Sequence, residues 1–181
     1  MVVFIFRYLY YKFIVMDILK LSTDWAKAEL FSARIVWLFS IIVLLSAAGF
    51  AYWGKTTMAR AFVIPFVVAG VLLIAVGIGL YAANKPRITQ FEKGYQMDAT
   101  GFVKKEIERT TKSAGDFNLV FKILPAISIV AAVFLMLFSS PNWRAISIAV
   151  ILTAVFLMAV DSNTSARNAA YREQLFKSTA L

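Results

Sequence analysis

The chain contains no cysteine and no histidine among its 181 residues. Without cysteine it forms no disulfide, carries no thiolate nucleophile and offers no cysteine-based metal site. Without histidine it lacks the commonest general base and metal ligand. The sequence also has no HExxH motif, no nucleophile elbow and no glycine-rich phosphate loop. We therefore expect a protein that is not an enzyme and that holds no cofactor or metal.

Charged residues are also scarce, at 16% of the chain, whereas 61% of the residues are hydrophobic. The mean hydropathy of +0.76 lies well above that of an ordinary soluble domain. Four apolar segments are long enough to cross a bilayer, which takes roughly 20 helical residues. They lack the polar stripes of helices in a soluble bundle. We predict an all-α integral membrane protein with four transmembrane helices, at residues 35–53, 61–83, 119–138 and 143–160.

Short polar links divide the four segments into two pairs. WGKTTMAR follows the first segment and SSPNWR follows the third. The links predict two transmembrane hairpins, at residues 35–83 and 119–160. Around the hairpins we expect three helical regions: interfacial or amphipathic helices at 1–34, a cytoplasmic connector at 84–118 that bends near Asp98–Gly101, and a cytoplasmic extension of the fourth helix at 161–181.

The first 16 residues are apolar but contain Arg7 and Lys12. They lack the small-residue cleavage site of a signal peptide, so we expect them to be retained. Their aromatic residues suit an interfacial helix. Met16 is an alternative start of the chain, and the sequence leaves both starts open.

Positive charge is distributed unevenly about the predicted spans. The short links hold only Lys55, Arg60 and Arg144 of the 19 lysine and arginine residues. By the positive-inside rule, both termini and the central connector are cytoplasmic in a multi-pass protein of the bacterial inner membrane. The basic residues flanking the spans are placed to meet anionic lipid headgroups. No basic and aromatic groove predicts nucleic-acid binding.

The two hairpins resemble each other in sequence. A shift of 84 residues aligns positions 60–76 with 144–160 and gives seven identities in 17 positions. Because each predicted hairpin starts and ends in the cytoplasm, the two copies would form a parallel internal repeat.

Small residues predict where the helices pack. Ala75, Gly79 and Ala83 in the second segment allow close approach of another helix backbone. We expect this face to pack within the first hairpin, with homo-oligomerisation as the alternative.

Two charges lie near the ends of the third and fourth segments. Lys122 and Asp161 are each 18 residues from the intervening link, so an antiparallel hairpin places them at similar depth. Neither has a charged counterpart in the first hairpin. Since an unpaired charge near the membrane core is costly, we predict a structural ion pair between them.

Polar residues beyond Asp161 recur along one helical face. Ser165, Asn168 and Arg172 lie on this stripe and, with Tyr95 of the connector, predict a partner-binding surface. Packing on the connector and simple solvation are the alternatives. Glu106 and Glu108 are interpreted as a solvated face.

The predicted spans carry few polar groups that a pore would need. Their deep positions hold only serine and threonine hydroxyls, which usually bond to their own helix. We therefore expect a non-enzymatic membrane protein that acts through an unidentified membrane or cytoplasmic protein, as an accessory or assembly subunit or an immunity protein against a toxin. The alternatives are an oligomeric ion channel, a pore-forming effector or a small transporter.

Overall fold

A computed structural model describes the backbone of residues 2–179 and the side chains of residues 18–178. Over the described residues the protein is all-helical, and four of its helices are long and apolar enough to cross a membrane. The predictions of an all-α chain and of four such helices are confirmed. In chain order the helices are α1 (Val2–Trp53), α2 (Thr57–Ala61), α3 (Val63–Met97), α4 (Ala99–Leu137) and α5 (Pro141–Thr179).

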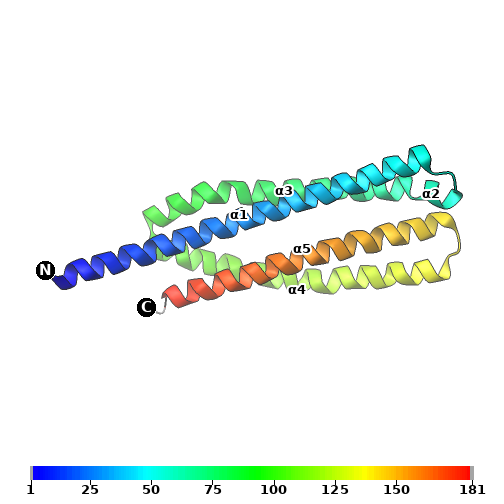
Figure 1. Ribbon diagram of the computed structural model, residues 1–181. Helices are drawn as coiled ribbons and strands as arrows, with labels where there is room; N and C mark the ends of the chain where they lie inside the picture. The colour runs from blue at the N-terminus through cyan, green and yellow to red at the C-terminus, as the bar shows by residue number, and fades with distance from the viewer. Residues whose placement is uncertain (1, 180–181) are drawn as a thin grey trace.

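The long helices pack in two antiparallel pairs. Figure 1 shows α1 running along α3 and α4 running along α5. The links after Trp53 and Leu137 lie at one end of the molecule, and the turn between α3 and α4 lies at the other. The two short links therefore lie at the same end of the molecule, although they are far apart in the sequence.

Local sequence explains where the helices break. At Asp98 the backbone is extended, with φ −154° and ψ 96°. Its carboxylate accepts a hydrogen bond from the backbone N–H of Gly101 at 2.9 Å, which caps the start of α4. Pro141 begins α5, where its missing N–H costs nothing. The chain thus bends at Asp98, within the predicted range.

The long helices continue without a break across the predicted boundaries between the apolar spans and the flanking helical regions. Residues 18–34 are part of α1 rather than a separate helix, and residues 84–97 prolong α3. The extension of the fourth helix runs to Thr179 at the end of α5. Each long helix therefore has an apolar part near the short links and a more polar part beyond it.

Two buried clusters of apolar side chains lie in these two parts. We call residues 35–83 and 119–160 the apolar half, and residues 18–34, 84–118 and 161–178 the polar half. All four long helices contribute to the core of the polar half, which is a four-helix bundle. Its buried apolar members are Ile18, Trp25, Ala26, Phe91, Tyr95, Phe102, Val103, Tyr171 and Leu175.

The core of the apolar half is formed mainly by α1 and α3. Val36, Val43, Ala69 and Leu73 are buried there, and Phe156 of α5 packs beside them. No described residue of α4 belongs to this core. The helix pairs thus meet closely in the polar half and less completely in the apolar half.

The prediction that the small-residue face packs within the first hairpin is wrong, because this face lies on the exposed side of α3, and its alternative of homo-oligomerisation stays a prediction. Ala75, Gly79 and Ala83 are exposed, whereas Leu73 and Gly77 are buried against α1. Two residues turn a helix by about 200°, so Ala75 points away from the face that its neighbours at 73 and 77 bury. A Cβ added at Gly77 would lie 2.4 Å from the Trp37 ring, but one added at Gly79 would meet nothing within 4 Å.

Candidate functional site

A buried ion pair links the first and last helices of the polar half. Arg167 on α5 donates to one carboxylate oxygen of Glu29 on α1, from Nε at 3.2 Å and from Nη2 at 3.0 Å. Ser32 and Asn163 accept further hydrogen bonds from the same guanidinium. Because Glu29 is only 2% exposed, these donors replace the water that its charge has lost.

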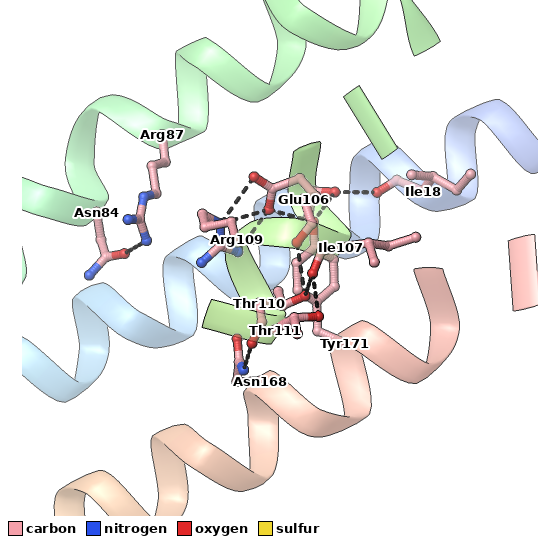
Figure 2. Close-up of polar contacts among 11 residues, drawn as sticks. Ile18, Asn84, Arg87, Glu106, Ile107, Arg109, Thr110, Thr111, Asn168 and Tyr171 are labelled. Carbon is pink, nitrogen blue, oxygen red and sulfur yellow. Dashed lines mark hydrogen bonds and ion pairs between the residues drawn. The ribbon is translucent and has the colours of Figure 1, made fainter. Parts of the chain in front are cut away.

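A second buried carboxylate, Glu106 on α4, lies in the same bundle. Arg109 binds it with Nε 3.0 Å from both oxygens and Nη2 2.7 Å from Oε2. The Tyr171 hydroxyl lies 3.1 Å from Glu106 Oε2 and 2.8 Å from Ser22 Oγ, so side chains of α1, α4 and α5 meet here (Figure 2). Burial, followed by the charge of Glu106, raises the pKa of Tyr171, which keeps its hydroxyl protonated as a donor.

These carboxylates were not identified as interior residues from the sequence. Glu106 was assigned to a solvated face, and this is wrong because the residue is only 6% exposed. For Glu29, helical spacing in the sequence could have predicted burial. It lies four residues after buried Trp25 and seven before buried Val36, on the same face of α1.

The structure does not assemble the predicted partner-binding residues into one exposed surface. Tyr95 is buried in the core, and Asn168 is 2% exposed. The amide of Asn168 donates to the backbone carbonyl of Thr110 at 2.8 Å, as Figure 2 shows. Ser165 and Arg172 are half-buried on α5. The Asn168 contact corresponds to the alternative in which the α5 stripe packs on the connector.

The predicted ion pair between Lys122 and Asp161 is not formed. Four ion pairs are present within residues 18–178, and this pair is not among them. Lys122 is exposed, and the charged neighbour of Asp161 is Glu29 on α1. Counting residues from the link predicts the depth of each side chain along its helix. An ion pair also requires that the two side chains lie on the sides of the helices that face each other.

Hydroxyl groups in the apolar half are largely used within single helices. Ser46, Ser128 and Thr153 each donate to the carbonyl four residues earlier. Ser40 instead donates from α1 to the Gly70 carbonyl of α3 at 2.7 Å, which ties the two helices together. Among residues 18–178 no three acidic side chains converge as metal ligands would.

An apolar groove of about 710 Å³ separates the two helix pairs in the apolar half. Residues of α2 and α3 form one wall, and residues of α4 and α5 form the other. Arg60 and Asn142 lie at its end near the short links. Its lining includes Ala61, Val68, Leu72, Leu124, Ile127, Ile146, Ala149 and Thr153.

The groove lies where α4 packs along α5 but makes little contact with α3. Of the α4 residues from 119 to 137, only Ala131 is fully buried. Ile127 and Ile146, on the α4–α5 wall, are 43% and 41% exposed, and Leu72 opposite them is 58% exposed. Large apolar side chains thus line an open space rather than a closed core.

Comparison of the chain with protein-family models, curated proteins and solved structures found no match.

Proposed function

We propose that this is a non-enzymatic multi-pass membrane protein that binds an apolar helix of a partner protein in the groove between its helix pairs. In this proposal the apolar half crosses the bilayer as two hairpins and the polar half lies in the cytoplasm with both termini. The distribution of charge supports this orientation, because only three of 19 basic residues lie in the short links. The same bias is typical of bacterial inner-membrane proteins.

The open groove is the observation on which the proposal rests. In a bilayer, helices associate through van der Waals packing, and an unfilled contact face is completed by lipid or by another helix. Ala61, Ala69, Ala149 and Ala154 lie in its lining. Small side chains let a helix backbone approach closely, which favours a protein helix as the occupant.

The polar half supports a role in assembly rather than in conduction. Its buried carboxylates are both held in ion pairs: Glu29 with Arg167 of another helix, and Glu106 with Arg109 of the same helix. The four helices are continuous between the two halves. A rigid bundle of this kind holds the groove walls at a fixed separation, which suits an accessory or assembly subunit, or an immunity protein that captures a toxin helix.

Site-specific photocrosslinking in cells tests the proposal. A photoreactive amino acid in place of Leu72 or Ile146 should crosslink to one specific protein, since both side chains line the groove. The same amino acid in place of Leu45 or Ile129 is the control, because these residues are 66% and 65% exposed but lie outside the groove.

The crosslinked products distinguish the alternatives. A specific heavier species from the groove positions, absent from the controls, supports the proposal. Products only at twice the 20.2 kDa of one chain would reject a separate partner in favour of a homo-oligomer. That result would lead next to ion-flux measurements in liposomes, which test the channel alternative. Equal labelling at all four positions would show that the groove has no selective occupant.

A further inference from the structure

Arg87, Arg109 and Arg167 are half-buried in the polar half, but only Arg109 and Arg167 form an ion pair with a carboxylate. Arg167 pairs with Glu29, and Arg109 pairs with Glu106. Arg87 on α3 forms none of the ion pairs within residues 18–178. Its Nη1 donates to the side-chain oxygen of Asn84 at 2.8 Å, which is a neutral acceptor. Arg87 therefore has no carboxylate within ion-pair distance, and the charges of Glu106 and Glu29 act on it only from further away.

Arg87 and Arg109 both lie near one aromatic ring. The Cζ atoms of Arg87 and Arg109 are 5.6 Å and 4.1 Å from the centroid of the same Trp25 ring. Figure 2 shows Arg87 and Asn84 of α3 pointing toward each other, on one side of the Glu106 and Arg109 side chains of α4. Burial, followed by the charge of Arg109, lowers the pKa of Arg87, whereas the charges of Glu106 and Glu29 act in the opposite direction.

Trp25 adds an unused donor to this group. The residue is 8% exposed, and its indole Nε1–H is buried with no hydrogen-bond acceptor within the described part of the chain. A buried donor without an acceptor costs about 1–3 kcal/mol, so such groups are uncommon in native proteins. Arg109 is already bound to Glu106, so Arg87 and the Trp25 N–H are the two groups of this cluster that lack a negatively charged acceptor.

We propose that the cluster of Arg87, Arg109 and Trp25 binds a phosphoryl group. A guanidinium presents its N–H groups as a planar fork that matches phosphate oxygens in pairs, and the charge of the anion balances Arg87. Arg87 lies four residues beyond Ala83, where the apolar half ends. If the apolar half spans the bilayer as proposed above, this is the depth of lipid headgroups, so an anionic phospholipid and a free phosphate share the required chemistry.

Binding to the purified full-length chain tests this site. The dissociation constant is measured in detergent by native mass spectrometry for phosphatidylglycerol against diacylglycerol, a neutral lipid with no phosphoryl group. For inorganic phosphate it is measured by calorimetry against sodium chloride of equal ionic strength. We expect Arg87→Gln to weaken binding of the phosphoryl ligand about tenfold or more, the usual effect of losing a hydrogen bond to a charged group.

Lys93→Gln is the matched control, because Lys93 is an exposed residue of the same helix and the charge change is identical. Trp25→Phe is a second variant that keeps an aromatic ring for the guanidinium groups but removes the Nε1–H donor. It should weaken binding less than Arg87→Gln does. Circular dichroism checks that each variant is folded, and Arg87→Lys, which keeps the charge, should recover part of the affinity.

The outcomes separate the two sources of the phosphoryl group. If Arg87→Gln weakens binding of phosphatidylglycerol but not of inorganic phosphate, the ligand is a lipid headgroup. If Arg87→Gln also weakens binding of inorganic phosphate, the site accepts free phosphate. The proposal is overturned if neither ligand binds the unmodified chain better than its neutral or chloride counterpart. It is also overturned if Arg87→Gln and Lys93→Gln weaken binding equally. Crosslinking at Leu72 and Ile146 is independent of these results, because those residues line the groove.

Discussion

Arg167 on α5 and Glu29 on α1 form a hydrogen-bonded ion pair across 138 residues of sequence, with a shortest N–O distance of 3.0 Å. The carboxylate is almost completely shielded from solvent, and the guanidinium side chain is 24% exposed. The pair therefore fixes the position of the last helix against the first in the polar half.

Replacing Arg167 with methionine should destabilise the protein by about 3–5 kcal/mol, because it leaves the Glu29 charge buried without a partner. Chemical unfolding in detergent, followed by circular dichroism, measures the loss. Lys177→Met is the control, since Lys177 forms an exposed pair with Glu173, and it should leave the unfolding midpoint unchanged. The double variant Glu29→Met with Arg167→Met should be more stable than Arg167→Met. A double variant that is no more stable would show that the uncompensated charge is not the cause.

Gly77→Ala and Gly79→Ala should change stability in opposite directions. The Cβ added at position 77 would lie 2.4 Å from the Trp37 ring, so α1 and α3 must separate or the ring must move. Overpacking of this kind costs about 1–3 kcal/mol. At position 79 the added methyl group has free space, and alanine is favoured over glycine in a helix by up to about 1 kcal/mol. Thermal unfolding of both variants in the same detergent provides the comparison; equal midpoints would contradict the packing of α1 on α3.

Asp98→Ala should loosen the start of α4. The Asp98 carboxylate accepts the Gly101 N–H at 2.9 Å, and loss of such a cap costs about 1 kcal/mol. Hydrogen exchange of the backbone amides at residues 100–102 should become faster, with little change in the apolar half. Asp98→Asn keeps a capping oxygen and should exchange at the rate of the unmodified chain. Faster exchange in Asp98→Asn as well would mean that capping is not the reason.

Tyr171→Phe should alter how stability depends on alkaline pH. Burial raises the pKa of Tyr171 above the value of about 10 that an unfolded chain shows. A raised pKa in the folded state gives stability that is fully present below pH of about 10 and is lost as the pH rises further. The unfolding free energy of the unmodified chain should therefore fall more steeply above this pH than that of Tyr171→Phe. Parallel curves between pH 9 and 11 would show that the hydroxyl is not buried in solution.

The sequence by itself determined that the chain is all-helical and has four helices apolar enough to cross a membrane. The reason is physical: a long apolar segment in a bilayer satisfies its backbone hydrogen bonds internally only as a helix or a closed barrel. The position of the bend at Asp98 was also predictable, because glycines nearby interrupt the helical pattern and Asp98 caps the next helix.

Only the tertiary structure decided which side of each helix is buried. In the apolar half no polar stripe marks a solvent side, so the sequence did not distinguish exposed Ala75 and Gly79 from buried Gly77. In the polar half, charge suggested a solvated face for Glu106, yet Arg109 and Tyr171 surround it in the bundle. Helix rotation is set by contacts between residues distant in sequence, and those contacts also decided that Lys122 and Asp161 do not pair and that Arg87 lies beside Arg109 over Trp25.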